Sequence, residues 1–203
     1  MRLFSPLQEF IRKGDTLLLT LCVVSNLFGL VLIYSATHYM NTSRYVLVQA
    51  MAMCIGIVVY ILLTFVDVEL LTEKCWKLLL LFNVFMIVIL KFFGNDDGTG
   101  NKSWIKLPLI PFNLQPAEIV KITFILLLSY QIVRIQQKRS ISSLSSVMQI
   151  SVHTLLMVGL IAVISGDMGM VLVYLLLFLV IAWTSGVKLR WFLLAAALCA
   201  VLG

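Results

Sequence analysis

The eighteen residues from Trp104 to Lys121, WIKLPLIPFNLQPAEIVK, say more about this chain than any other stretch. A polar segment interrupted by prolines runs directly into an apolar stretch that carries Glu118 and Lys121 near its start. Hydrocarbon cannot solvate charged side chains, so ionisable residues inside a membrane span usually face a protein interior and have a function. The segment therefore predicts the start of a transmembrane helix with a polar site beside it.

The composition of the whole chain is that of a membrane protein. Hydrophobic residues make up 62% of the 203 residues and charged residues 12%, against roughly 45–50% and 25% in soluble domains. Most apolar runs are close to the length of about 20 residues with which a helix crosses a bilayer. We predict an all-α, polytopic transmembrane helix bundle that forms a single integral membrane domain over residues 1–203. Its seven expected spans are 15–36, 45–66, 76–93, 115–133, 147–165, 168–186 and 191–203.

The first and last apolar runs indicate whether the domain is processed at its N-terminal end and whether it continues beyond its C-terminal end. The first follows Arg12 and Lys13 as a signal peptide would, but it is too long for one and further spans follow, so it is expected to be retained. The last stops at Gly203 without a polar flank. We therefore expect the domain to be truncated at its C-terminal end, with more spans following.

Lysine and arginine counts predict the orientation of the bundle. One side of the membrane carries ten of these residues: Arg2, Arg12, Lys13, Lys74, Lys77, Arg134, Lys138, Arg139, Lys188 and Arg190. The other side carries four: Arg44, Lys91, Lys102 and Lys106. Because positive residues concentrate on the cytoplasmic side, the N-terminus is predicted to be cytoplasmic and the loop 94–114 to be outside. Since these charges flank apolar runs and form no patch, the net charge of +6 does not indicate nucleic-acid binding.

Gln115-Pro116-Ala117-Glu118 has the features of a helix start. Proline is favoured at the first helical position, and Glu118 complements the positive end of the helix dipole. Lys121 lies one turn further along the same face, close enough to pair with Glu118. Two interpretations stay open. The pair is structural and fixes the fourth span against its neighbours, or Lys121 and the helix N-terminus face an anionic head group.

Asp167 lies at the tight outer turn before the sixth span, in Ser165-Gly166-Asp167-Met168-Gly169. An Asp before an apolar run is the expected N-cap of a helix. The alternative is that Asp167 borders a cavity, where it coordinates a cation or positions a substrate. The residues around it do not decide between the two.

The remaining polar residues are predicted to have structural roles. Trp104 is expected to anchor the chain at the membrane interface. His38 and His153 stand alone at span ends and are interpreted as interfacial histidines rather than ligands or bases. Asn26 and Asn83 are expected to form hydrogen bonds between helices.

Most catalytic arrangements are missing from the sequence. It contains no Ser-His-Asp arrangement, metal-ligand cluster or dinucleotide loop. Its four cysteines lie in or beside apolar runs, with no C-x-x-C, and are interpreted as small buried residues: Cys22, Cys54, Cys75 and Cys199.

Taken in order, these residues resemble the SEDS family (shape, elongation, division and sporulation), the FtsW/RodA/SpoVE group of peptidoglycan polymerases. The family pattern is a Gly/Asn-rich outer loop, a Trp-Ile pair, and Gln-Pro-Ser/Ala-Glu-x-x-Lys opening the fourth span. This chain matches it with Gly100-Asn101, Trp104-Ile105, Gln115-Pro116-Ala117-Glu118 and Lys121. A second pattern, Gln-Pro-Asp-x-Gly-Thr before the sixth span, is matched only at Asp167 and Gly169.

The resemblance implies a peptidoglycan glycosyltransferase that polymerises lipid II in bacterial cell wall synthesis, cell shape or cell division. It implies a multi-pass protein of the bacterial cell membrane, with a class B penicillin-binding protein as transpeptidase partner. Family members have about ten spans, so the likeness covers the N-terminal half. The Asp regarded as catalytic is expected beyond residue 203, and no catalytic residue is expected within this chain.

The same resemblance implies a role for each candidate site residue. The starts of spans four and six would border a cavity for the undecaprenyl-pyrophosphate substrate, because helix N-termini attract phosphate. Residues implied in binding or positioning this substrate are Trp104, Gln115, Pro116, Glu118, Lys121 and Asp167. No organic cofactor is implied, and a divalent cation is left open.

Two other functions remain open from the sequence. A flippase or transporter of the lipid-linked precursor fits charged residues in spans equally well. The paired inverted repeats frequent in transporters are not evident here. A non-catalytic scaffold of the division or elongation complex is the third interpretation.

Overall fold

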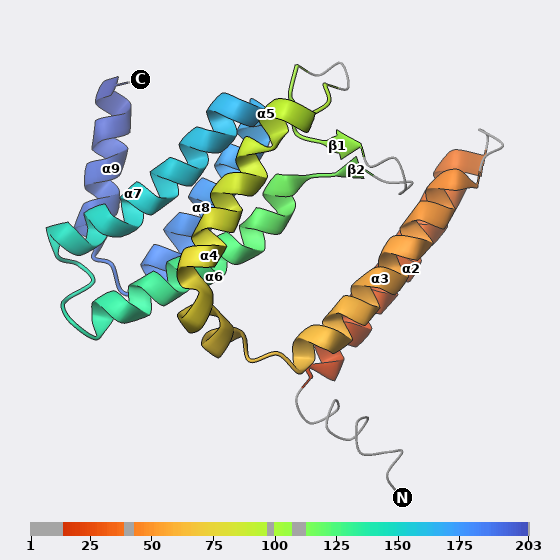
Figure 1. Cartoon of the computed structure of the whole chain (residues 1–203), viewed down its shortest axis with the longest axis horizontal. Helices are drawn as coiled ribbons and strands as arrows, with labels where there is room; N and C mark the ends of the chain where they lie inside the picture. The colour runs from red at the N-terminus through yellow and green to blue at the C-terminus, as the bar shows by residue number, and fades with distance from the viewer. Residues whose placement is uncertain (1–13, 39–42, 97–99, 107–112, 203) are drawn as a thin grey trace, which may run out of the picture. The chain divides into compact units, whose positions relative to one another are not determined.

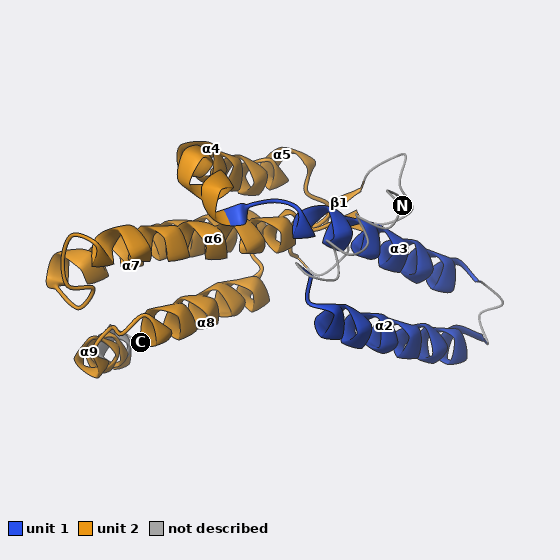
Figure 2. Ribbon diagram, turned by 90° about the horizontal axis from the view of Figure 1, so that it is seen from below, with its two compact units in different colours: residues 1–68 blue, residues 69–203 orange. Residues whose placement is uncertain are grey.

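The computed structural model describes residues 14–38, 43–96, 100–106 and 113–202. Helices account for nearly all of these residues. The chain divides into two compact units, Met1–Val68 and Glu69–Gly203, which Figure 2 draws in different colours. Each unit is described by itself.

Unit 1 contains two long apolar helices, α2 (Thr16–Thr37) and α3 (Arg44–Thr64), which pack side by side in antiparallel directions (Figure 1). The side chain of Asp15 caps α2 by accepting a hydrogen bond from the Leu18 amide at 2.9 Å. Gln49 Nε2 donates to Asn26 Oδ1 at 3.2 Å, which confirms that Asn26 joins two helices.

The cysteines of unit 1 differ from the prediction. Cys22 and Cys54 were predicted to be buried, and both side chains are exposed. The reason is that α2 and α3 cover one face of each other only, so neither helix has a buried residue. The apolar surface they expose is suited to lipid, because a bilayer is as apolar as these side chains.

Unit 2 is built around one central helix, α6 (Pro116–Gln136), which has eight buried residues. Phe124 and Leu128 are fully buried within it, against Met157 of α7 (Leu144–Leu160) and Tyr174 of α8 (Met168–Thr184). Nearly all of α4 (Val68–Val88) also belongs to this unit, with the short α5 (Leu90–Phe93), the π-helix η2 (Ile161–Ser165) and α9 (Leu189–Leu202). The helix that carries Glu118 and Lys121 is therefore the one most enclosed by protein.

The two ends of unit 2 are structurally distinct. At the hairpin end, α5 leads into strand β1 (Ile105–Lys106), which pairs antiparallel with β2 (Asn113–Leu114), and α6 and α8 begin here (Figure 1). At the connector end, residues 137–143 join α6 to α7, and Gly186 lies in the turn between α8 and α9. The buried Ser142 ties these connections together by donating to Gly186 O at 3.2 Å.

The all-α prediction is confirmed for the described residues, apart from the two short strands. Five helical segments are long and apolar enough to cross a membrane, namely Thr16–Thr37, Arg44–Thr64, Val68–Phe93, Pro116–Gln136 and Leu144–Ser165. The run at 168–186 is an apolar helix of 17 residues, and the run at 191–203 corresponds to α9 with 14 residues. The number of seven spans and the cytoplasmic N-terminus stay predictions, as does a single domain over residues 1–203.

Helix boundaries differ from the predicted spans where charged residues continue a helix. The third span was predicted from residue 76, but α4 begins at Val68 and includes Glu69, Glu73 and Lys74. The fourth was predicted to end at 133, and α6 continues to Gln136. Glu, Lys, Arg and Gln are good helix formers. A helix can therefore continue beyond the apolar run, which corresponds only to the part that would lie in the hydrocarbon.

Gly94, which ends α5, lies in a place that has no room for a side chain. A Cβ at this position would clash with the Leu90 carbonyl oxygen and would lie 2.9 Å from the Lys102 carbonyl oxygen. We expect Gly94→Ala to lower the free energy of unfolding by roughly 1–3 kcal/mol, because the backbone must shift to relieve the overlap. Thermal unfolding of the detergent-solubilised protein measures this change. Gly159→Ala is the control, since a Cβ there would meet nothing within 4 Å apart from its chain neighbours and the backbone of its own helix. Equal stability of both variants would contradict the close packing.

Candidate functional site

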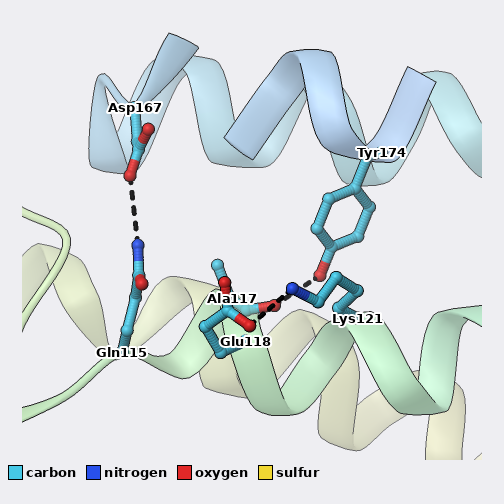
Figure 3. A network of polar contacts seen from close by, with 6 residues as sticks. All are labelled: Gln115, Ala117, Glu118, Lys121, Asp167 and Tyr174. Atoms are coloured by element: carbon cyan, nitrogen blue, oxygen red, sulfur yellow. Dashed lines mark hydrogen bonds and ion pairs between the residues drawn. The ribbon is translucent and has the colours of Figure 1, made fainter. Parts of the chain in front are cut away.

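A cluster of hydrogen bonds at the hairpin end is centred on the carboxylate of Asp167. Asp167 Oδ1 accepts from the Met170 amide at 3.0 Å and so caps α8. Asp167 Oδ2 accepts from Ser103 Oγ and from Gln115 Nε2, both at 3.1 Å (Figure 3 shows the latter bond). Ser103 Oγ lies 2.9 Å from Ser165 Oγ. One carboxylate thus joins the loop before β1, the residue before α6 and the start of α8.

The π-helix η2 and the glycine that follows it position Ser165 and Asp167 next to the loop before β1. The Gly166 amide donates to Ile161 O at 3.2 Å, and Gly166 has φ of 72°, a left-handed conformation that favours glycine. The turn leaves Ser165 O free to accept from the Lys102 amide at 2.9 Å. The loop before β1 is therefore hydrogen-bonded to the end of the π-helix. π-Helical turns are frequent at functional sites.

Glu118 and Lys121 form the predicted ion pair on the first turns of α6. Lys121 Nζ lies 2.5 Å from Glu118 Oε2, and the Lys121 side chain is 26% exposed and that of Glu118 49% exposed. Pro116 occupies the start of the helix as predicted. Figure 3 shows the pair between the starts of α6 and α8, in the same region as Asp167 and Gln115. The first two turns of α6 thus present a cation and an anion to partly exposed space.

Tyr174 of α8 fixes the backbone of this turn. Its hydroxyl donates to Ala117 O at 2.8 Å, as Figure 3 shows, and its side chain is fully buried. The Tyr174 ring lies 5.0 Å from the Phe124 ring of α6, a distance typical of favourable aromatic pairs. The spacing of α6 and α8 is therefore held by one hydrogen bond and one ring contact directly beside the ion pair.

Removing that hydroxyl is expected to weaken the contact between α6 and α8. Tyr174→Phe keeps the ring and loses one buried hydrogen bond, so we expect the free energy of unfolding to fall by about 1 kcal/mol. Denaturant titration followed by circular dichroism measures the loss. Tyr130→Phe on α6 is the control, because that residue is partly exposed and should change stability by less than about 0.5 kcal/mol. Equal effects of the two variants would contradict a special role for Tyr174.

The structure brings most predicted site residues together. Gln115 is bound to Asp167, and Glu118 to Lys121. The N-cap prediction for Asp167 is confirmed, although the same carboxylate also joins two further segments. Trp104 is 39% exposed and is held through its backbone, whose carbonyl accepts from the Asn95 amide at 2.8 Å. A role of any of these residues toward a substrate stays a prediction.

Sequence reasoning missed Ser103, Ser165 and Tyr174, and it was wrong about His153. Instead of standing at the interface, His153 is partly buried within α7, with its ring edge against Phe124 at 5.4 Å. Its Nδ1 lies 3.0 Å from Gln131 Oε1 of α6. By contrast, the prediction for Asn83 is confirmed, because it accepts a hydrogen bond from Thr123 of α6.

The residues that the structure describes offer no assembled metal centre. No group of three or more His, Cys, Asp or Glu side chains gathers among residues 14–38, 43–96, 100–106 and 113–202. The oxygens of Asp167 are already engaged with three donors from the protein. A divalent cation therefore stays an open prediction, and no step is assigned to one.

Comparison with known protein families gives a match that includes all the residues of this site. The family described as "Cell cycle protein", FtsW/RodA/SpoVE, matches residues 15–203.

The chain belongs to the FtsW/RodA/SpoVE family.

Individual relatives agree with this family assignment. A protein of Geobacter sp. (strain M18) named "Probable peptidoglycan glycosyltransferase FtsW" is 28% identical over 190 residues, which are 88% of this chain and 49% of that protein. A protein of the same name from Trichlorobacter lovleyi is 27% identical over 186 residues, 86% of this chain and 46% of that protein. The chain thus spans about half the length of the curated relatives it matches.

Family membership and the five candidate spans together show where the protein is located and in which cellular process its family acts. The chain is a multi-pass integral protein of the bacterial cell membrane, and it belongs to a family of peptidoglycan synthesis. The resemblance drawn from Gln115-Pro116-Ala117-Glu118 and Lys121 is therefore confirmed at the level of the family.

Proposed function

We propose that this chain contributes the outer-face part of a lipid diphosphate site in a peptidoglycan glycosyltransferase that polymerises lipid II. In this proposal the seven apolar helices all span the membrane, the N-terminus is cytoplasmic, and the hairpin end of unit 2 faces outward. The chain spans about half of its curated relatives, so polymerisation is proposed for the protein expressed from its complete reading frame.

The ion pair on the first turns of α6 is the observation that carries the proposal. The N-terminus of a helix carries the positive end of the helix dipole, which attracts phosphate. Lys121 adds a compact cation that is 26% exposed, so an anion can approach it. Glu118 holds the ammonium in place before substrate binds and limits the cost of a buried charge.

The remaining site residues position this turn. Asp167 and Gln115 connect the starts of α6 and α8, and Pro116 fixes the first residue of the helix. Trp104 is proposed to anchor the loop in the head-group layer. The polyprenyl tail of the substrate would lie along the apolar helix surfaces below.

No proton transfer is assigned to the residues of this chain. Deprotonating a sugar hydroxyl needs a base, and Glu118 is a poor one while it is paired with Lys121. The base is proposed to be an Asp of a further outer loop, and a class B penicillin-binding protein is proposed as the transpeptidase partner.

Polymerisation of labelled lipid II tests the proposal. The protein from the complete reading frame, purified with a class B penicillin-binding protein, should lengthen glycan strands separable by gel electrophoresis. Transbilayer movement of fluorescent lipid II in proteoliposomes without polymer would favour a transporter instead. Stable association with the partner, without polymerisation or transbilayer movement of lipid II, would favour a non-catalytic scaffold.

A further inference from the structure

A second polar site lies away from the hairpin end, in a groove of about 660 Å³ between α4, α6 and α7. Cavities of about 300–1,000 Å³ are the size that commonly holds small ligands. Its lining residues come from α4, α6 and α7 and from the segment that follows α6. None of the activities discussed above uses this groove.

The groove is strongly basic at one end. Arg134, Lys138 and Arg139 all belong to the last turn of α6 or the residues after it, at the connector end. Cations are stabilised there by the negative end of the helix dipole. No described lining residue is acidic, so three positive charges face the groove without a carboxylate in its described wall.

A hydrogen-bond network holds one of these cations in a fixed position. Arg139 donates to Gln149 Oε1 at 2.8 Å and to Ser145 Oγ at 3.0 Å. Gln131 Nε2 in turn donates to Gln149 O at 3.2 Å, and Gln131 Oε1 contacts His153 Nδ1 at 3.0 Å. The guanidinium is thus ordered before any ligand binds, which reduces the entropy cost of binding.

The opposite end of the groove is apolar. Leu127 lies two turns before Arg134 on α6, and Leu80 and Leu156 come from the neighbouring helices. His153 also lines the groove, and its Nε2 is buried without a hydrogen-bond partner among the described residues. The groove therefore runs from a cationic mouth at the connector end to an apolar wall nearer the middle of α6.

We infer that this groove binds an anionic glycerophospholipid of the surrounding leaflet. The phosphodiester would lie between Arg134, Lys138 and Arg139, and an acyl chain would follow the leucines. Basic pockets between transmembrane helices are known to bind anionic lipid head groups. Charge complementarity selects an anionic lipid over a zwitterionic one. Under the predicted orientation this leaflet is the cytoplasmic one, but the inference depends only on the groove.

Native mass spectrometry of the whole chain tests this inference. The protein is released from nanodiscs that contain equal amounts of palmitoyl-oleoyl phosphatidylglycerol and palmitoyl-oleoyl phosphatidylcholine, so that only the head group differs. We expect phosphatidylglycerol to be retained preferentially. Arg134→Gln with Lys138→Gln should reduce that preference by roughly 25-fold, since each of the two cations contributes about fivefold to anionic lipid binding near a membrane surface.

The control is a charge-matched variant, Lys74→Gln with Lys188→Gln, in which both residues are exposed and outside the groove. It should keep the full preference. Circular dichroism verifies that each variant is folded, and Leu156→Ala provides a second readout by weakening lipid retention without changing charge. Absence of any head-group preference, or an equal loss in the two charge variants, would overturn the inference, because either result would mean that the groove is covered or that only net charge matters.

Discussion

Replacing Lys121 by methionine is expected to reduce lipid II polymerisation by roughly 10- to 100-fold in the protein expressed from its complete reading frame. A charged hydrogen bond contributes about 1.5–3 kcal/mol, and the diphosphate would lose one such contact. Methionine keeps most of the volume of the side chain, so packing around α6 should change little. Initial rates of polymerisation measured over a range of lipid II concentrations separate a loss in kcat from a rise in KM.

A double-variant cycle distinguishes substrate binding from a structural ion pair. If Lys121 only neutralises Glu118, then Glu118→Gln combined with Lys121→Met should restore activity, because no unpaired charge is left. If Lys121 contacts the diphosphate, the double variant should remain as impaired as Lys121→Met. We expect the second outcome.

Lys91→Met is the matched control for these variants. Lys91 lies on α5 at the same end of unit 2 and is exposed, but it is not on the first turns of α6. It should polymerise lipid II normally. Equal losses for Lys91→Met and Lys121→Met would mean that only the general surface charge matters, and normal activity of Lys121→Met would remove this residue from the site.

Replacing Asp167 by alanine is expected to have the largest effect on stability, a loss of roughly 2–4 kcal/mol. The carboxylate accepts bonds from the Met170 amide, Ser103 and Gln115. Loss of an N-cap costs about 1 kcal/mol, and each of the other donors is left partly buried without its partner. Thermal unfolding in detergent measures the sum.

Asp167→Asn serves as the control within this prediction. Its side-chain oxygen can still cap α8, but the amide nitrogen that replaces Oδ2 cannot accept from Ser103 or Gln115. We therefore expect a loss intermediate between the wild type and Asp167→Ala. A change below about 0.5 kcal/mol for the alanine variant is the size of an ordinary surface substitution and would show that the cluster does not hold the hairpin end together.

Local features of this site could be predicted from the sequence because they involve neighbouring residues. Proline at the first helical position, Glu118 with Lys121 one turn later, and Asp167 as a helix cap each follow from spacings of a few residues. The spans were found for a similar reason, since a hydrophobic run of sufficient length is a local property.

Long-range contacts could not be predicted in the same way. Ser103 contacts Asp167 across 64 residues, and Tyr174 contacts Ala117 across 57. No periodic pattern indicates such pairs, because they depend on how α6, α8 and the hairpin pack. The groove was missed because Arg134, Lys138 and Arg139 were attributed to orientation alone, and flanking charges do not reveal which of them converge on one cavity.

Labelling of a single cysteine on the first turns of α6 tests the central claim most directly. Glu118→Cys keeps Lys121, and the four native cysteines are replaced by alanine. We predict that a membrane-impermeant maleimide labels Cys at this position from outside intact cells, and that undecaprenyl pyrophosphate slows the labelling of the purified protein. Labelling only from the cytoplasmic side, or a labelling rate unaffected by the lipid diphosphate, would contradict the account.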